Sequence, residues 1–356
     1  MRRTSRVTVL RVAIIVVAYV AGIAGAATYL VRTQWTSAIA EARGQMFHYR
    51  TQMAPELGPD PEPADVVWLG DSTVMSFTPY VGYPRLVDAR VLQPLGRRMK
   101  LFATVGLDAI GYYGLIGPAL ARHPRLVVLT ANLRLFAPAS GRATFYDLLA
   151  WLPAEEIPRL ARLPYNVRGA TMPSLVLMRW LRRPAVLDVV TFVEGLRHAA
   201  AVSARWDVLG PSTSPEGMIR LFARLKERSE AEYMRPLSAS QPLVRFFGAA
   251  VELATRHGAQ VLVVVAPIPT GTLVERGLFD GVAVARSVHA LRRVVEANGG
   301  ALVDASTALA DEYFYDAEGG HLTTAGAELM VQIVRGPIVE RLNGLVASGS
   351  VGDAPP

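Results

Sequence analysis

Five short, uninterrupted apolar runs divide the body of the chain, and segments of helical character separate most of them. The runs are Val66–Leu69, Leu101–Val105, Leu126–Thr130, Val261–Ala266 and Ala301–Val303. A continuously apolar strand is buried on both faces, which is typical of a parallel sheet covered by helices. The pattern therefore predicts an α/β fold: a three-layer α/β/α sandwich around a five-stranded parallel sheet.

The covering helices are predicted from apolar residues at helical spacing, at Tyr112–Arg122, Pro242–His257, Val282–Ala297 and Thr324–Leu342. Residues 137–240 separate the third run from the fourth, far more than one crossover helix requires. Several helical stretches with prolines between them occur there. We expect a helical insert, either a packing element or a substrate lid, within one domain at 64–345, followed by a disordered tail at 346–356.

The longest apolar stretch is an uncharged run of 20 residues from Val12 to Val31. At 1.5 Å per residue it matches a hydrocarbon core of about 30 Å. Four arginines precede it and a weaker basic flank follows, which predicts a cytoplasmic N-terminus and an extracytoplasmic body. A cleaved signal peptide is the alternative, because residues 24–26 have the form of a cleavage site. The run continues past them, which favours an uncleaved single-pass anchor at 1–32.

Between the anchor and the sandwich, residues 33–52 have helical spacing and residues 55–63 are rich in proline, glycine and acid. A juxtamembrane helix and a linker are therefore expected over 33–63. The chain has no cysteine, which excludes disulfides, Cys-ligated zinc and thiol nucleophiles. Its net charge of +7 comes from scattered arginines without interleaved aromatic residues, so a nucleic-acid partner is not expected. The histidines lack ligand spacing and no glycine-rich phosphate loop occurs, so neither metal nor cofactor is predicted.

A candidate nucleophile follows the first strand, in Gly70-Asp71-Ser72. Ligand sites of open parallel sheets lie at the carboxyl ends of the strands, so Ser72 is expected at that edge. The glycine permits a tight turn, and the serine hydroxyl would lie beside backbone N–H groups of the next helix. The structural alternative is a helix cap, in which Asp71 or Ser72 accepts hydrogen bonds from those amides.

Two further residues are expected at the same edge. Gly106 follows the second strand and Asn132 follows the third. A glycine N–H and an asparagine amide are suitable donors to an oxyanion that develops beside a serine. Each also has a plain alternative as a turn or loop residue.

The fourth element is His321, which lies between the last strand and the final helix. Glu318 lies three residues before it, across a Gly-Gly turn. A carboxylate in that place can hold the imidazole in the tautomer that accepts a serine proton.

Together, the Ser72 block, Gly106, Asn132 and the acid-x-x-His-Leu-Thr block resemble the SGNH (GDSL-type) hydrolase superfamily, in which these blocks occur in the same order. The resemblance covers about residues 64–340 apart from the insert. It implies a flavodoxin-like sheet of order 2-1-3-4-5 and serine ester chemistry. Ser72 would be the nucleophile and His321 the general base, with the Ser72 and Gly106 N–H groups and the Asn132 amide as the oxyanion hole.

The sequence departs from the family pattern in its third block and in the triad acid. The residues around Asn132 lack the glycine and aspartate of many members. Glu318 stands where the family usually has aspartate, and Asp316 lies five residues before His321. We favour Glu318 as the acid because it keeps the spacing, with Asp316 as the alternative.

The resemblance and the predicted anchor imply a membrane-anchored, extracytoplasmic serine esterase. Its substrates would be acyl esters, such as acetyl esters, of envelope carbohydrate or lipid. Two alternatives are an O-acyltransferase on a cell-envelope polymer that uses the same Ser–His site, and a non-catalytic SGNH-like envelope assembly protein. The expected partners are the membrane and the acylated substrate.

Overall fold

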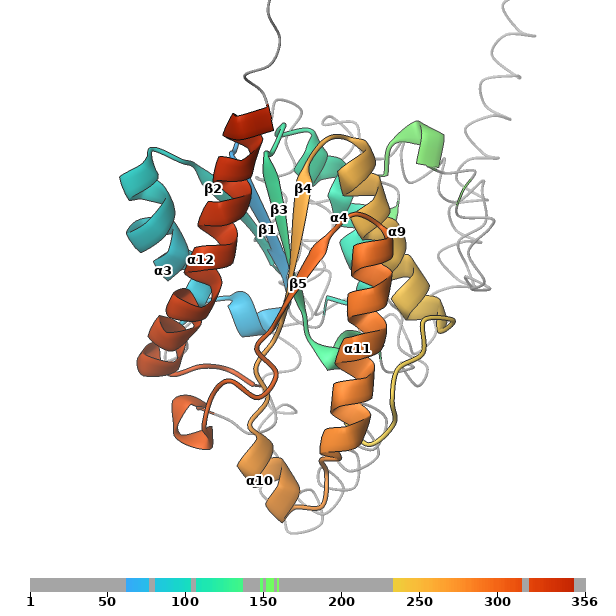
Figure 1. Cartoon of the computed structure of the whole chain (residues 1–356), viewed down its shortest axis with the longest axis vertical. Helices are drawn as coiled ribbons and strands as arrows, with labels where there is room; N and C mark the ends of the chain where they lie inside the picture. Colours follow the sequence, from blue (N-terminus) through green and yellow to red (C-terminus); the bar gives the residue numbers. More distant parts are fainter. Residues whose placement is uncertain are drawn as a thin grey trace, which may run out of the picture. The chain divides into compact units, whose positions relative to one another are not determined.

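The structure, a computed structural model, describes residues 62–76, 81–103, 107–136, 148–149, 152–156, 159, 233–315 and 320–348 (Figure 1). All of them belong to one compact unit. The strands are β1 (Val66–Gly70), β2 (Met99–Ala103), β3 (Leu126–Ala131), β4 (Gln260–Val265) and β5 (Ala301–Asp304). The α-helices are α3 (Tyr83–Val87), α4 (Ala109–Leu120), α9 (Pro242–Arg256), α10 (Thr270–Glu275), α11 (Gly281–Ala297) and α12 (Thr324–Ser348). Short helices are η2 (Ser72–Val74), η3 (Asp88–Leu92), η4 (Gln93–Leu95), η5 (Leu133–Phe136), η7 (Ala154–Glu156) and η8 (Asp311–Tyr313).

The five strands form one parallel sheet of order β2-β1-β3-β4-β5, as predicted. Every residue of the central strands β1 and β3 is buried, which explains why their sequences are almost entirely apolar. Part of β2 and part of β5 is accessible at the two edges of the sheet. The apolar runs therefore predicted the strands within two residues at each end.

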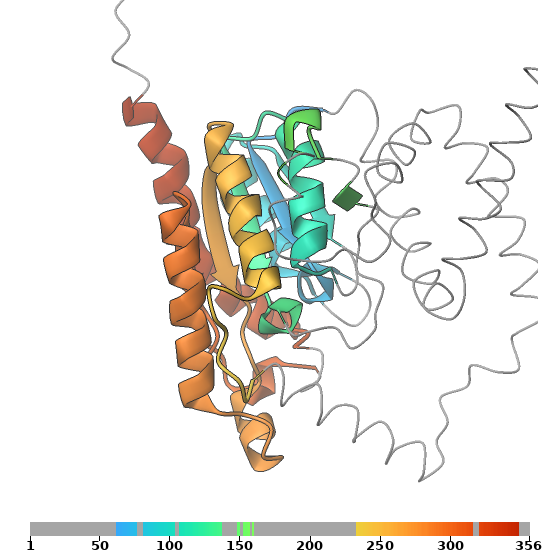
Figure 2. The same cartoon turned by 90° about the vertical axis from the view of Figure 1, so that its right-hand side faces the viewer.

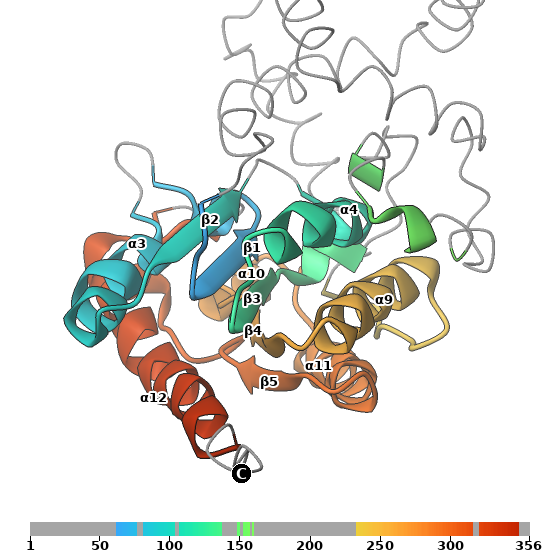
Figure 3. The same ribbon diagram turned by 90° about the horizontal axis from the view of Figure 1, so that it is seen from above.

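Helices cover both faces of the sheet, which gives the predicted three layers (Figure 3). The helices α4, α9 and α11 pack on one face and enclose one hydrophobic cluster. On this face α9 lies between α4 and α11 (Figure 2). The helices α3 and α12 enclose a second cluster on the opposite face.

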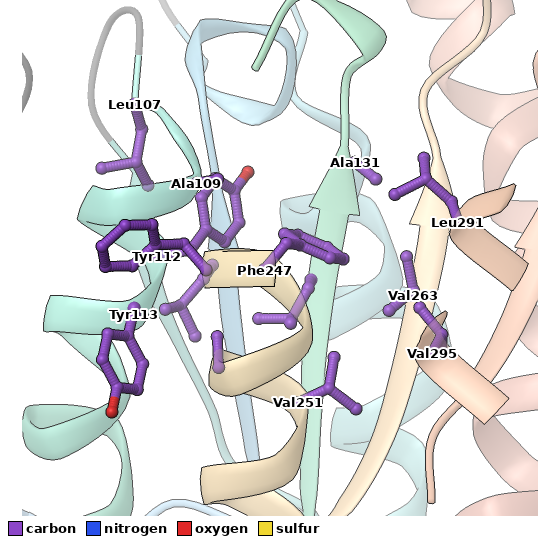
Figure 4. Packing of buried hydrophobic residues seen from close by; sticks show 14 of the residues in the cluster. Leu107, Ala109, Tyr112, Tyr113, Ala131, Phe247, Val251, Val263, Leu291 and Val295 are labelled. Carbon is purple, nitrogen blue, oxygen red and sulfur yellow. The ribbon is translucent and has the colours of Figure 1, made fainter. Parts of the chain in front are cut away.

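Aromatic side chains fill the first cluster between α4 and α9 (Figure 4). The Phe247 ring packs edge-to-face with two other rings. Its centroid lies 5.7 Å from that of Tyr112 and 5.3 Å from that of Phe136. Edge-to-face pairs of this kind contribute about 0.5–1.5 kcal/mol beyond their buried area. They connect η5, which directly follows β3, to the helices on this face.

The first described residues of the predicted insert pack against α4. A Cβ on Gly114 would lie 2.4 Å from the backbone carbonyl carbon of Leu148, so only glycine permits this approach. Leu148, Leu149 and Leu152 are buried in the same cluster. The remainder of the insert up to residue 232 lies outside the described residues, apart from residues 153–156 and 159.

A buried carboxylate also attaches this segment to the sandwich. Glu156 is 1% exposed and accepts hydrogen bonds from the Tyr113 hydroxyl at 3.0 Å and from Arg256 at 2.9 Å. Burial, followed by the charge of Glu156, raises the pKa of Tyr113 well above its ordinary value. Tyr113 therefore stays a neutral donor to the acid, and three elements (α4, η7 and α9) are joined.

Two helices were not predicted from the sequence, α3 and α10. Both are short, and the first N–H groups of α10 bond Asp311, a residue distant in the chain. The helix α4 starts three residues earlier than predicted because Asp108 caps it, accepting from Gly111 N–H at 2.8 Å. The helix α12 runs to Ser348, three residues into the segment predicted as a tail.

The predicted anchor at 1–32 and the juxtamembrane helix at 33–52 lie outside the described residues. Among the residues that are described, no helix is both long and apolar enough to cross a membrane.

Candidate active site

Ser72 lies directly after β1, at the carboxyl edge of the sheet, as the first residue of η2. The turn is tight, because a Cβ on Gly70 would lie 2.1 Å from a methyl group of Val74. Asp71 makes the cap, since its Oδ1 accepts from the backbone N–H of Thr73 at 3.0 Å and from the Thr73 hydroxyl. Asp71 and Thr73 are each 5% exposed, whereas Ser72 is half-buried. The capping role thus falls to Asp71, and the serine is the accessible residue of the turn.

Asn132 follows β3 and reaches the same turn from the neighbouring strand. Its Nδ2 donates to Asp71 Oδ2 at 3.1 Å, and its side chain is 5% exposed. The parallel pairing of Leu69 with Leu129 brings the ends of β1 and β3 together. Asn132 therefore bonds the residue directly before Ser72, so these two predicted site residues lie at adjoining strand ends.

A buried hydrogen-bond cluster lies beneath this edge, centred on Thr130. The Thr130 hydroxyl accepts from Trp68 Nε1 at 2.9 Å and bonds the Tyr83 hydroxyl at 3.2 Å. The Thr130 carbonyl oxygen accepts from the Tyr112 hydroxyl at 2.6 Å. The cluster ties together β1, α3, α4 and β3, two residues before Asn132.

The two tyrosines of this cluster keep their protons. Burial raises the pKa of Tyr83 and Tyr112 well above the ordinary value for tyrosine. The hydrogen bond with Thr130 acts to lower the pKa of Tyr83. The nearby charge of Asp71 raises the pKa of both tyrosines. Both groups are therefore available as neutral hydrogen-bonding groups throughout the physiological range.

His321 lies in a short antiparallel pairing before α12. Phe314 pairs with Leu322 in a β-bridge, and the Tyr315 N–H donates to the His321 carbonyl at 2.8 Å. Tyr315 is 52% exposed, so an accessible aromatic residue lies opposite His321. The Val81 N–H donates to the Leu322 carbonyl at 3.5 Å, which connects this loop to the segment before α3.

That segment also contacts the serine turn. The Gly82 N–H donates to Ser76 Oγ at 3.0 Å, and a Cβ on Gly82 would lie 2.1 Å from the Val74 carbonyl oxygen. Val74 shares a buried hydrophobic cluster with Leu322. Backbone contacts thus run from the Ser72 turn through residues 81–82 to the His321 loop, and the two loops belong to one end of the sheet.

Asp311 holds the His321 loop to α10. Its carboxylate accepts from the Gly271 N–H at 3.0 Å and from the N–H and hydroxyl of Thr272. Both α10 and the loop before α12 lie beyond the same end of the sheet (Figure 1). Burial acts to raise the pKa of Asp311. The hydrogen bonds from Thr272 and Gly271 together outweigh that effect, so the pKa lies below its ordinary value.

Three predicted site residues lie outside the described residues: Gly106, Asp316 and Glu318. The position of Gly106 and the choice of triad acid therefore stay predictions, as do the catalytic and oxyanion roles of the other site residues. Gly320, next to His321, has a left-handed φ of 68°, which favours glycine there and agrees with the predicted turn.

Sequence reasoning missed the residues that support the site. The sequence offers Asp71 as a cap but does not predict its bond to Asn132. The roles of Thr130 and Asp311 depend on partners tens of residues away. A signal for Thr130 was available, because a polar residue inside an otherwise apolar, buried strand needs a hydrogen-bond partner.

Comparisons with known proteins give only remote similarities. No protein-family model matches the chain, and no curated protein matches it in sequence. Among solved structures, a GDSL-like lipase from Bacteroides thetaiotaomicron has 11% identity and a TM-score of 0.39, covering 82% of this chain and 97% of that one. A protein from Streptococcus pneumoniae, described as a platelet activating factor, has 8% identity and a TM-score of 0.41, covering 85% and 100%. A GDSL-like lipase from Parabacteroides merdae has 10% identity and a TM-score of 0.37, covering 81% and 100%.

At these identities and TM-scores the similarities assign no activity. The function below therefore rests on the residues of the site.

Proposed function

We propose that this protein is a serine esterase of SGNH type that hydrolyses acyl esters through an acyl-enzyme on Ser72. The observation that carries the proposal is the bond of 3.1 Å between Asn132 Nδ2 and Asp71 Oδ2. It holds a buried side-chain amide beside the turn that carries an accessible serine. A serine hydroxyl with fixed N–H donors beside it is the arrangement that acyl transfer requires.

In the proposed reaction, Ser72 Oγ attacks the ester carbonyl carbon while His321 takes the hydroxyl proton. The tetrahedral oxyanion accepts hydrogen bonds from the Asn132 amide and from backbone N–H groups at the start of η2. As the C–O bond breaks, the leaving alcohol takes the proton from His321. Water then attacks the acyl-enzyme, His321 accepts one of its protons, and that proton returns to Ser72 as the carboxylic acid leaves.

The test is hydrolysis of p-nitrophenyl acetate by the full-length protein, with labelling by a fluorophosphonate probe. Ser72→Ala and His321→Ala should each lower kcat by about 10³-fold or more. Ser72→Ala should also abolish labelling. The matched controls are Ser240→Ala and His289→Ala, since both residues are exposed and distant in the chain from the site. If Ser72→Ala keeps wild-type turnover and labelling, the proposal is wrong.

We further propose that the substrates are acyl esters of envelope carbohydrate or lipid, and that the anchor at 1–32 holds the enzyme at the membrane with its catalytic domain outside the cytoplasm. Product analysis with an acetylated sugar separates hydrolysis, which releases acetate, from transfer, which acetylates an added acceptor. If neither product forms and the probe leaves Ser72 unlabelled, a non-catalytic envelope protein is favoured instead.

The absence of cysteine allows a direct test of orientation. Thr4→Cys and Ser240→Cys each introduce a single thiol. In intact cells a membrane-impermeant maleimide should label position 240, and position 4 should react only after lysis. Labelling of position 240 only after lysis would contradict the proposed orientation, and loss of position 4 from the mature chain would indicate a cleaved signal peptide.

A further inference from the structure

Both oxygens of the Asp71 carboxylate are used, and they serve two different strands. Oδ1 accepts from the backbone and hydroxyl of Thr73, in the turn that carries the serine. Oδ2 accepts from Asn132 Nδ2, at the end of β3. Asp71 and Asn132 are each 5% exposed, so bulk water competes little for these bonds. The carboxylate is thus a fixed bridge between the two loops.

The chemistry of the bridge determines which end of the Asn132 carboxamide faces Asp71. The oxygen and nitrogen of a carboxamide are nearly equal in size, and a half-turn of its last torsion exchanges them. An ionised carboxylate only accepts hydrogen bonds, so it attracts the nitrogen and repels the oxygen. The Thr73 donors hold the carboxylate itself in place.

We propose that Asp71 is a positioning residue that sets the Asn132 carboxamide with its nitrogen toward the Ser72 turn. This inference rests on the proposed function. One N–H of Nδ2 bonds Asp71, and the geometry of the planar amide then fixes the direction of the other N–H, which is the donor to the oxyanion. In the opposite orientation the carbonyl oxygen would face the developing negative charge and raise the barrier.

Aspartate is required for this selection because asparagine at position 71 would permit both orientations. An asparagine amide can donate as well as accept, so its nitrogen could bond the Asn132 oxygen in the inverted arrangement. Asp71→Asn is nearly isosteric and isolates this property. It removes the negative charge and the preference while keeping the shape of the side chain.

The experiment measures kcat and KM of the full-length protein for p-nitrophenyl acetate. Removing an oxyanion donor lowers kcat by about 10²–10³-fold, so partial inversion of the amide in Asp71→Asn should lower kcat by about 10–100-fold. KM should change by less than about twofold, because the donor acts on the transition state. Inhibition by phenylboronic acid, which forms a tetrahedral adduct on serine, should weaken by at least about tenfold.

A double-mutant cycle with Asn132→Ala separates positioning from a structural role. When the Asn132 amide is absent, Asp71→Asn should lower kcat by less than about twofold further. A general loss of structure would instead lower kcat by the same factor in both backgrounds, and that result would overturn the proposal. Asp280→Asn is the control: Asp280 caps α11 through Val282 and Ala283, and kcat should be unchanged.

Failure of the inference is distinguishable from failure of the function. Full activity in Asp71→Asn, with Ser72→Ala inactive, would reject the positioning role and leave the esterase intact. Full activity in Ser72→Ala would reject both. If Asp71→Asn does not fold, Thr73→Val decides by the same cycle, since it removes only the hydroxyl donor to Oδ1.

Discussion

Replacing Thr130 with valine tests the buried hydrogen-bond cluster beneath the site. The two side chains have nearly the same shape, so the substitution leaves no cavity and removes only the hydroxyl. That hydroxyl accepts from Trp68 Nε1 at 2.9 Å and bonds the Tyr83 hydroxyl at 3.2 Å. The Tyr112 bond goes to the Thr130 main chain and should survive.

The expected cost follows from the burial of these groups. Trp68 and Thr130 are 0% exposed and Tyr83 is 1% exposed, so water cannot replace the lost partner. A buried donor without a partner costs about 1–3 kcal/mol, and the lost Tyr83 bond adds about 0.5–1.5 kcal/mol. We expect Thr130→Val to lower the free energy of unfolding by about 2–4 kcal/mol.

The assay is urea-induced unfolding of the full-length protein, monitored by circular dichroism. The free energies of unfolding of the variants are compared on the condition that their m-values are the same. Thr130→Ser is the matched control, because it keeps the hydroxyl and loses one methyl group, at about 1 kcal/mol. If the valine variant is as stable as the serine variant, loss of the hydroxyl costs no more than loss of one methyl group, and the reasoning is refuted.

Three further substitutions test how the surrounding segments are held. Gly82→Ala puts a Cβ 2.1 Å from a backbone oxygen of the Ser72 turn, so kcat for ester hydrolysis should fall at least about tenfold. Arg256→Met leaves the buried Glu156 carboxylate without its nearest cation, which should lower the free energy of unfolding by about 2–4 kcal/mol; solvent weakens the pair because the Arg256 side chain is 35% exposed. The pKa of Asp311 is lower in the folded state than its unfolded value of about 3.9, so its ionised carboxylate stabilises the fold above that value. This stabilisation is lost as the pH falls through the folded pKa. Asp311→Asn should therefore lower Tm at pH 7, and its difference from wild type should shrink toward pH 3.

Each of these has its own control. Gly336→Ala lies in α12 with nothing within 4 Å of the added Cβ, so it should keep full activity; equal effects at positions 82 and 336 would contradict the steric account. Glu156→Gln combined with Arg256→Met should be more stable than Arg256→Met alone, since the buried charge is gone. A Tm difference for Asp311→Asn that does not change with pH would show that its charge is not involved.

The elements predicted best are those whose local sequence reflects their burial. β1 and β3 lie at the centre of the sheet, and their almost entirely apolar sequences follow from burial on both faces. The helix α10 was not predicted because it has six residues and its first N–H groups bond Asp311, about 40 residues later. No local signal identifies a cap supplied from so far along the chain.

The sequence by itself determined the class of fold, the strands, and the residue types at their carboxyl ends, because burial and turn geometry act on neighbouring residues. Those residue types, in their order along the chain, resemble the SGNH pattern, and the resemblance pointed to Ser72, Asn132 and His321. Only the tertiary structure decided that Asp71 accepts from Asn132, 61 residues away, and that Thr130 bonds Trp68, 62 residues away. Hydrogen bonds between strands depend on which strands become neighbours, and the periodicity of one segment carries no information about its partner.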